Sequence, residues 1–213
     1  MDGKVTAKPD QAAIASPRRS PSQQRSRERV ERMLAAASAL IAEQGSDAMR
    51  MGEVAERAGV SIGSLYQFFP DKRAIVWALA ERYTAESQAC ISAALEDVSD
   101  AEGLRRSFSE LVDIYYQLFL AEPVMRDIWS GTQADKALRE LELADSRANA
   151  DFLLAVLKRI RPDADPIELE TAAFLVWQMG EAAVRLAISV ERDEGDRLIA
   201  AYKRMALREL VGE

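Results

Sequence analysis

The sequence predicts an all-α protein of about nine helices, with a small N-terminal three-helix domain and a larger helical domain behind it. Three observations support this prediction. Apolar residues recur at the spacing of three to four that marks amphipathic helices along most of the 213 residues. The alternation of β-branched residues that marks strands is absent from the sequence. Segment 51–73 has the pattern of two short helices joined by a tight turn.

The N-terminal part divides into a tail and a first helix. Residues 1–26 are rich in Pro, Ser, Gln, Ala and Arg and have almost no large apolar residue, so we expect a disordered basic tail. Residues 27–44 follow the helical period up to Gly45 and form the first helix. We assign 27–83 to the N-terminal domain and 84–213 to the larger domain.

Within segment 51–73 the local signals favour a helix-turn-helix. Gly59 supplies the positive φ that ends a helix, and Ser61 is a good N-cap for the next one. Leu65 and Phe69, four residues apart, fall on the buried side of that second helix. This arrangement presents a second helix to the DNA major groove. An ordinary three-helix corner without a role in DNA binding is the alternative.

The exposed face of the second helix is suited to nucleic acid. Ser and Gln side chains hydrogen-bond base edges, Tyr reaches phosphates, and Gly63 allows close approach to a backbone. Asp71 caps a further helix and places Lys72 in its first turn, where a cation beside free N–H groups can clamp a phosphate.

Residues 29–82 resemble the DNA-binding domain of the TetR (tetracycline-repressor-like) family of bacterial transcription regulators. Nine residues sit at the family's offsets: Ala55, Ala58, Gly59, Val60, Ser61, Gly63, Tyr66, Phe69 and Lys72. Two positions depart from the pattern. Phe68 replaces a usual His, and either contacts a thymine methyl or simply packs. Arg50 stands where Thr often caps a helix, and can contact phosphate instead. The expected DNA-binding residues are Arg27, Arg50, Ser61, Ile62, Gly63, Ser64, Tyr66, Gln67, Phe68 and Lys72.

The charge distribution agrees with DNA binding at one end. Residues 1–83 hold 13 basic and 10 acidic residues, whereas the rest of the chain holds 15 and 25. Local charge governs phosphate contact, because charges are screened over about 8–10 Å. We therefore expect the acidic part to point away from DNA. The basic end of the tail is either a solvated segment or an arm on the DNA backbone or in the minor groove.

The larger domain is helical in pattern throughout. We expect a Ser99-to-Glu102 capping box, a helix break at Gly131, a cap at Thr132 and a cap at Asp165. One expected helix opens at the capping box and carries apolar residues from Leu104 to Phe119. The others cover residues 71–98, 123–129, 133–160, 166–192 and 195–211.

Catalytic chemistry is poorly supported. The chain has no His, and it lacks the glycine-rich loops that bind phosphates. We expect no enzyme activity, no cofactor and no metal, although paired acids could still serve an enzyme. Cys90 lies in an Ala-rich stretch and is expected to be a buried, inert thiol. A single Cys, no apolar signal segment and no membrane-length apolar run favour the cytoplasm.

Aromatic and Met side chains of the larger domain can either form plain core or line a cavity for a small apolar or amphipathic molecule. The resemblance favours the cavity, since TetR-like proteins bind an effector in this domain. The candidate pocket residues are Phe108, Tyr115, Phe119, Met125, Trp129, Phe152, Trp177 and Gln178.

The last two helices are candidates for self-association. Helix 166–192 is apolar on more than one stripe, and its small residues allow a second helix to approach closely. Burial within one subunit is the alternative; the resemblance favours a homodimer. The candidate interface residues are Phe174, Gly180, Ala183, Val184, Ala187, Tyr202 and Met205.

Together these features predict a sequence-specific DNA-binding regulator of the bacterial cytoplasm and nucleoid. It would be a repressor on a near-palindromic operator, released by a small-molecule effector; an activator is a variant of the same prediction. The alternative is a helical small-molecule-binding or protein-interaction module whose helix-turn-helix is structural only.

Overall fold

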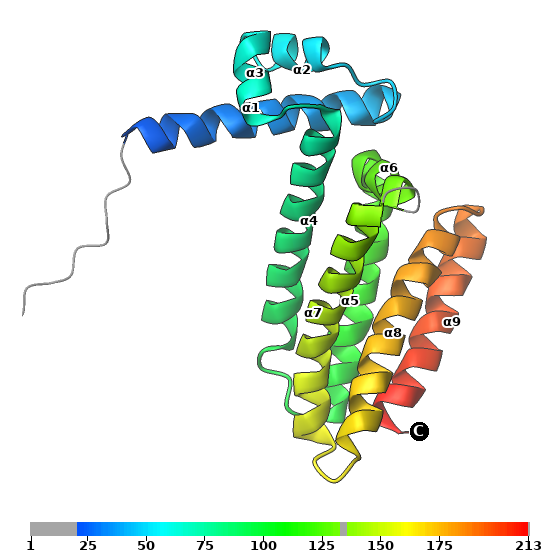
Figure 1. The fold of residues 1–213 in the computed structure, drawn as a ribbon. Helices are drawn as coiled ribbons and strands as arrows, with labels where there is room; N and C mark the ends of the chain where they lie inside the picture. The colour runs from blue at the N-terminus through cyan, green and yellow to red at the C-terminus, as the bar shows by residue number, and fades with distance from the viewer. Residues whose placement is uncertain (1–20, 133–135, 213) are drawn as a thin grey trace, which may run out of the picture.

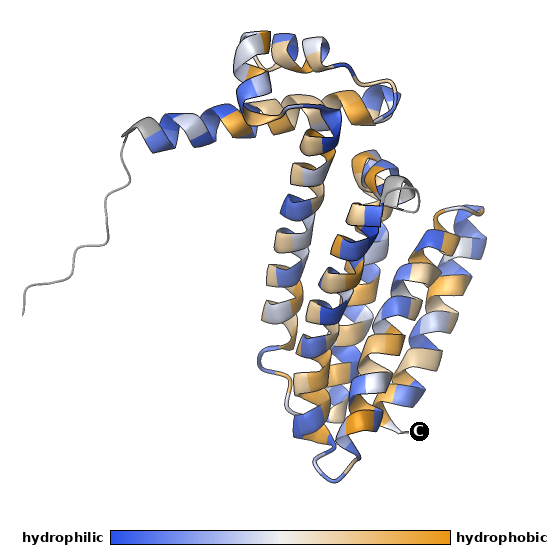
Figure 2. Ribbon diagram, viewed as in Figure 1, coloured by the Kyte–Doolittle hydropathy of each residue, from blue (hydrophilic) through white to orange (hydrophobic). Residues whose placement is uncertain are grey.

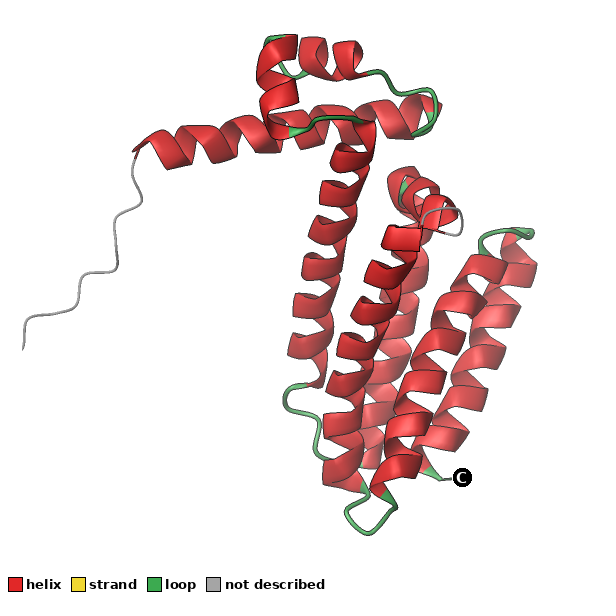
Figure 3. Ribbon diagram, in the orientation of Figure 1, coloured by secondary structure: helices red, strands yellow, loops and turns green. Residues whose placement is uncertain are grey.

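The computed structural model describes residues 21–132 and 136–212, and all regular elements in these ranges are α-helices (Figure 3). The helices are α1 (Pro21–Gln44), α2 (Met51–Arg57), α3 (Ile62–Phe68), α4 (Lys72–Leu95), α5 (Ala101–Ala121), α6 (Pro123–Thr132), α7 (Lys136–Ile160), α8 (Pro166–Ala187) and α9 (Arg192–Val211). The predicted all-α class is confirmed. No helix in this part of the chain is long and apolar enough to cross a membrane.

The molecule has two parts joined by α4 (Figure 1). Helix α1 crosses the end of α4, and α2 and α3 lie on the far side of α1. Helices α5, α7, α8 and α9 run alongside α4 as a bundle, and α6 sits at the end of the bundle near α1. Two α6 side chains, Val124 and Ile128, belong to the same apolar core as Met33 and Leu65, so α6 connects the bundle to the N-terminal domain.

The helix-turn-helix forms as its local signals predict. Gly59 has a φ of 64°, in the left-handed region that glycine tolerates. The Ser61 hydroxyl accepts a hydrogen bond from the Ser64 N–H at 3.2 Å, and the Asp71 carboxylate accepts one from the Ala74 N–H at 2.9 Å. Both predicted caps are confirmed.

Helix α1 starts earlier than predicted. It begins at Pro21 rather than residue 27, so the prediction of disorder is wrong for residues 21–26, while residues 1–20 lie outside the described part. Polar helices can be supported by side-chain pairs one turn apart, and Gln24 donates to Glu28 at 3.0 Å in this segment. The low apolar content that indicated disorder does not prevent such a helix.

Several boundaries in the bundle also differ from the predictions. Helix α4 ends at Leu95, and α5 is capped by Asp100 rather than Ser99, with the Asp100 carboxylate accepting from the Gly103 N–H at 2.7 Å. Helix α6 continues to Thr132, past its predicted end at Trp129 and through the predicted break at Gly131. Since residues 133–135 are not described, the predicted Thr132 cap lies at the edge of that gap.

Within the bundle, the α8–α9 link differs most from its predicted boundaries. Helix α8 ends at Ala187, not near residue 192, and α9 begins at Arg192. Gly195 explains how α9 can start so close to α8, because a Cβ there would lie 2.5 Å from the Ala187 carbonyl oxygen. The predicted Asp165 cap of α8 is confirmed, with the carboxylate accepting from the Ile167 N–H at 2.9 Å. Apolar residues occupy most of α8 in Figure 2.

Candidate functional site

The exposed surface of α3 is the first candidate site. Ile62 and Tyr66 are 45% and 50% exposed, and Gly63 and Gln67 are also exposed. The helix lies on the side of α1 opposite the bundle, so no other part of the described protomer covers this face. Ser64 is half-buried, and its hydroxyl accepts a hydrogen bond from Arg29 of α1 at 3.4 Å.

Phe68 faces the protein rather than open solvent. It is half-buried and packs against the N-terminal apolar core that contains Leu65. Of the two interpretations of this departure from the family pattern, packing is the one that the geometry favours.

Lys72 sits in the first turn of α4 as predicted, but its ammonium already has protein partners. The Nζ atom donates to the carbonyl oxygens of Asp47 at 2.9 Å and Ser46 at 3.3 Å. The Ser46 N–H in turn donates to the Asp127 carboxylate of α6 at 2.8 Å. The turn between α1 and α2 is therefore held by both α4 and α6, and a phosphate contact by Lys72 stays a prediction.

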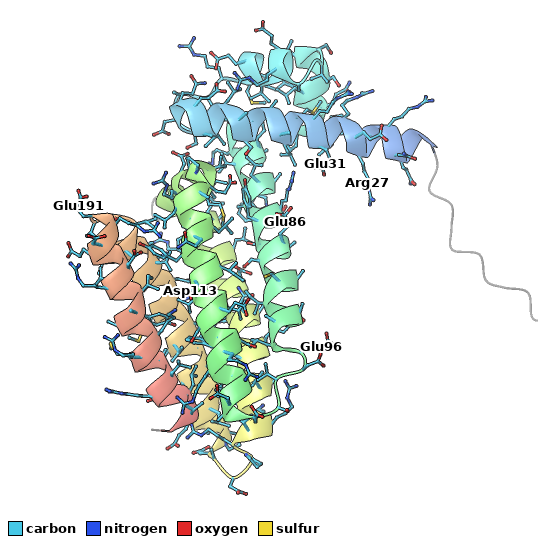
Figure 4. All side chains as sticks on the ribbon, turned by 180° about the vertical axis from the view of Figure 1, so that it is seen from behind. Arg27, Glu31, Glu86, Glu96, Asp113 and Glu191 are labelled. Atoms are coloured by element: carbon cyan, nitrogen blue, oxygen red, sulfur yellow. The ribbon has the colours of Figure 1, made fainter. Side chains whose placement is uncertain are left out.

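The two candidate arginines lie in different places. Arg50 is exposed at the N-cap position of α2, with no side-chain capping bond. Arg27 points away from α2 and α3 in Figure 4, on the side of α1 that also carries Glu31. Glu31 accepts from the Arg82 guanidinium of α4 at 3.1 Å, so this side of α1 faces the bundle. The structure does not bring Arg27 together with the α3 surface.

The second candidate site is a cavity of about 420 Å³ formed by α4, α5 and α8, with Tyr202 contributed by α9. Its volume is within the range of small-molecule sites, about 300–1,000 Å³. Three predicted pocket residues line it: Phe108, Tyr115 and Trp177. The lining residues that sequence reasoning missed are Arg82, Tyr83, Glu86, Ser87, Cys90, Ile91, Leu111, Val112, Ile114, Leu118, Glu122, Gly180, Glu181, Val184 and Tyr202.

Three of the other predicted pocket residues, Phe119, Met125 and Trp129, lie in a mainly aromatic cluster beside the cavity instead. The ring of Phe119 lies 4.8 Å from that of Tyr115 and 4.9 Å from that of Trp129, between centroids, and Phe119 is fully buried. Met125 is buried in the same cluster. Because Tyr115 belongs to both groups, the cluster joins the cavity wall to α6.

The last two predicted pocket residues, Phe152 and Gln178, lie outside the lining of this cavity. Phe152 packs on the main bundle core rather than lining the cavity. Gln178 also stays outside the cavity lining, but its amide donates to the Glu181 carboxylate at 3.3 Å. It therefore supports a lining residue rather than facing the cavity directly.

Glu181 is the most unusual group in the lining, because it is only 5% exposed. Burial raises the pKa of its carboxyl to about 7, and the negative charges of Glu142 and Asp145 act in the same direction. The Ser146 hydroxyl lies 2.7 Å from Glu181 Oε1 and 2.9 Å from the Glu142 carbonyl oxygen. A hydroxyl has a single proton, so a protonated Glu181 allows both contacts to be hydrogen bonds. An acid within the apolar sequence VWQMGEAAV was the signal that could have found this residue.

Cys90 corrects another expectation. Its side chain is exposed and lines the cavity, so the thiol is not buried in the core. Its place on α4 shows that this helix gives one face to the cavity, which the pattern of the sequence alone did not reveal.

The predicted dimer residues separate into two groups. Val184, Ala187 and Tyr202 are buried inside the protomer, so the structure does not offer them as surface for a second copy. Gly180 serves a contact within the protomer, because a Cβ there would lie 2.7 Å from the Tyr202 hydroxyl.

The remaining dimer residues, Phe174, Ala183 and Met205, keep some exposure, and Met205 is 57% exposed. The Phe174 ring lies under the Arg147 guanidinium at 4.5 Å. The sequence prediction had not included the apolar residues that α8 leaves most exposed: Ile167, Leu175, Met179 and Leu186.

Comparison with known proteins agrees with this architecture. Residues 33–79 match the family described as bacterial regulatory proteins, tetR family, and residues 102–213 match the tetracyclin repressor-like C-terminal domain. The HTH-type transcriptional repressor KstR of Rhodococcus jostii is 45% identical over 58 residues, which are 27% of each chain. The match thus spans about a quarter of that relative.

Solved structures resemble a much larger share of the chain. A TetR-family transcriptional regulator from Streptomyces coelicolor is 28% identical, with a TM-score of 0.68 over 88% of this chain and 97% of that one. RolR in complex with resorcinol is 23% identical, with a TM-score of 0.58 over 89% of this chain and 95% of that one, and shares the fold. With its C-terminal match covering more than half of the sequence, the chain belongs to the TetR family of transcription regulators.

Proposed function

We propose that this protein is a homodimeric transcriptional repressor that binds a near-palindromic DNA operator and is released by a small-molecule effector. The observation that carries the proposal is the exposed face of α3, where Tyr66 and Gln67 project beside Gly63 with no covering element. A helix presented in this way fits the major groove. As a repressor of chromosomal genes it would act in the bacterial cytoplasm, at the nucleoid.

The apolar surface of α8 supports the dimer. Leu175, Met179 and Leu186 are exposed and share one side of the helix, since they are spaced by four and seven residues. Monomeric proteins rarely leave a continuous apolar strip in water. Met205 is also exposed, on α9, which packs against α8. Such a strip is suited to a two-fold contact with the same helix of a second copy.

A two-fold dimer also sets the geometry of the operator. Two α3 helices related by the dimer axis would enter successive major grooves about 34–36 Å apart. The operator half-sites would then be inverted copies of one sequence.

Release by an effector is supported by two connections between the cavity and the DNA-binding domain. One runs from Tyr115 through the aromatic cluster to α6, whose Asp127 holds the α1–α2 turn. The other is Arg82, which lines the cavity and donates to Glu31 of α1. RolR, which shares the fold, is a protein solved with the small molecule resorcinol bound.

The energy needed for release is modest. A ligand shifts a two-state equilibrium only through its different affinities for the two states. A 100-fold preference for the form that does not bind DNA supplies about 2.7 kcal/mol. In this proposal the effector creates the preference by moving α4 or α6, which changes the distance between the two α3 helices.

DNA binding is tested by selecting genomic fragments with the purified protein and measuring affinities by fluorescence anisotropy at a fixed salt concentration. We expect one selected duplex to bind at least about 1,000-fold more tightly than a scrambled duplex of equal length. Equal affinity for both duplexes would instead support a binding or interaction module whose helix-turn-helix is only structural.

A further inference from the structure

Among the carboxyl groups that line the cavity between α4, α5 and α8, the one that is buried belongs to Glu181. We propose that the cavity binds a basic amphipathic amine, whose ammonium pairs with Glu181 while its apolar body lies against Phe108, Leu111 and Trp177. This inference rests on the proposed function only in treating the cavity as the effector site.

The hydrogen-bond partners of Glu181 are neutral, and the attraction of Arg185 lowers the pKa of the Glu181 carboxyl less than burial raises it. Its two carboxylate oxygens contact neutral groups, the hydroxyl of Ser146 at 2.7 Å and the amide of Gln178 at 3.3 Å. The guanidinium of Arg185 is engaged with Glu142 at 2.9 Å and lies 4.6 Å from the centroid of the Trp129 ring. A buried carboxylate without a directly paired cation is unfavourable, and a ligand ammonium would supply that pair.

The rest of the lining favours the same sign of ligand. Among the described lining residues, the acids are Glu86, Glu122 and Glu181, and the one base is Arg82. Arg82 is already paired with Glu86 at 2.9 Å and with Glu31 at 3.1 Å. A carboxylate ligand would therefore meet net negative charge, whereas an amine would meet net attraction.

The walls of the cavity explain why the amine must be amphipathic. Most of the lining is apolar, with Phe108 and Leu111 contributed by α5 and Trp177 by α8. Apolar surface removed from water contributes to binding in proportion to its area. A hydrophilic polyamine would fill this space poorly, whereas an aryl or alkyl chain ending in one ammonium matches it.

Amine binding is coupled to protonation of the site. In the ligand-free protein the Glu181 carboxyl has a pKa near 7. Because the amine pairs with the carboxylate form, its binding below this pH releases the proton of Glu181. Its affinity should rise about tenfold between pH 6 and pH 8 and then level off. The charged or titratable groups around Glu181 are Tyr115 of α5, Glu142 and Asp145 of α7, Arg185 of α8 and Tyr202 of α9.

Three probes that share one apolar body test the proposal: 4-phenylbutylamine, 4-phenylbutanol and 4-phenylbutanoate. Calorimetric titration of the full-length protein at pH 8 should give the amine at least about tenfold tighter binding than the alcohol, with the carboxylate weakest. Glu181→Gln, which keeps the shape and polarity of the side chain, should bring the amine to the affinity of the alcohol. The alcohol should bind the variant within about threefold of wild type, which shows that the cavity is intact.

A matched control separates this contact from general charge. Glu170 is exposed on the same helix and lies outside the cavity lining, so Glu170→Gln removes an equal charge. We expect Glu170→Gln to keep the amine preference of the wild type.

The outcomes distinguish the inference from the proposed function. The amine proposal is overturned by any of three results. These are alcohol or carboxylate binding as tight as that of the amine, no binding of any probe, and an unchanged amine affinity in Glu181→Gln. If the alcohol or carboxylate binds best and releases operator DNA, the proposed function stands and the amine inference fails. If the amine binds as described but leaves the operator complex unaffected, the inference stands and effector release by this site fails.

Discussion

The helix-turn-helix domain and the C-terminal bundle bury different kinds of side chain. The N-terminal core is made of apolar residues such as Met33, Leu65 and Ile75, each fully buried. The bundle contains the three buried polar residues found in the described ranges, Ser146, Asn149 and Glu181. It also contains the cavity of about 420 Å³ beside Glu181.

The difference matches the two proposed roles: the N-terminal domain holds the DNA-reading helix in place, and the bundle binds the ligand. A well-packed apolar core fixes the position of α3, and rigid positioning is what a base-reading helix requires. A cavity with a buried carboxyl costs stability, and a ligand that fills it can recover that cost. The four predictions below test the contrast, from the largest expected effect to the smallest.

Shortening Leu65 should damage the rigid domain most. Leu65→Ala removes a fully buried side chain of α3 and should lower the free energy of unfolding by about 2–5 kcal/mol. Chemical denaturation followed by circular dichroism measures the loss. The adjacent Tyr66 is 50% exposed, so Tyr66→Ala should stay within about 0.5 kcal/mol of wild type while weakening operator binding. Similar losses of stability in both variants would show that α3 is not anchored as described.

The buried carboxyl of the bundle should make stability depend on pH. The pKa of Glu181 is raised to about 7 in the folded protein from its ordinary value of 4.5, so its contribution favours folding most at low pH. That contribution should decline by roughly 3 kcal/mol as the pH rises from about 4.5 to 7, and then stay constant.

Glu181→Gln isolates this effect. Because the sequence contains no His, no imidazole titrates in the neutral range. Unfolding free energies of wild type and variant between pH 5 and pH 8 should diverge, with the variant relatively more stable at pH 8. Asp145, whose pKa is also raised by burial, remains in both proteins and cancels in the comparison. Parallel curves would contradict a titrating Glu181.

Gly180 tests how closely α8 and α9 must approach. A Cβ at this position would lie 2.7 Å from the Tyr202 hydroxyl, which donates to the Val176 carbonyl at 2.7 Å. Gly180→Ala should therefore cost about 1–3 kcal/mol in thermal or chemical unfolding. Gly52→Ala is the control, since nothing lies within 4 Å of its new Cβ, and it should be neutral or stabilising. Equal behaviour of the two variants would mean that the close contact is not required.

Lys72 tests whether one side chain serves both structure and DNA. Lys72→Ala removes the hydrogen bonds to the Ser46 and Asp47 carbonyls and should cost about 0.5–1.5 kcal/mol of stability. If the same ammonium also reaches a phosphate, affinity should fall for all duplexes and the salt slope should decrease by about one unit.

Changes at Gln67 provide the contrast, because they should alter operator preference with little effect on the salt slope. A Lys72→Ala protein that loses stability but keeps its salt slope would restrict Lys72 to its structural contacts.

Sequence reasoning reached the N-terminal domain because its signals are local. The Gly59 turn and the Ser61 and Asp71 caps each depend on neighbours within a few residues, and all three are confirmed. The α8–α9 boundary failed because Gly195 acts through a contact with Ala187, which only the folded chain brings close. The role of Lys72 was incomplete for the same reason, since its partners lie 25 and 26 residues away.

The cavity was less accessible to sequence reasoning. Phe119 and Trp177 carry the same apolar signal, yet one is core and the other lines the cavity, and only the packing of α4, α5 and α8 decides between them. The face of α4 that includes Cys90 was missed because its residues are of mixed polarity. They line the cavity only because the fold places this face next to α5 and α8.

Operator affinity with the cavity empty and filled tests the central claim that the bundle controls the DNA-binding domain. Anisotropy of a selected operator duplex would be measured with wild type and Glu181→Gln at pH 8, with and without saturating 4-phenylbutylamine. We expect the amine to lower the operator affinity of wild type by at least about tenfold and to leave that of the variant unchanged. An operator affinity of wild type that stays constant while calorimetry shows the amine bound would contradict the account.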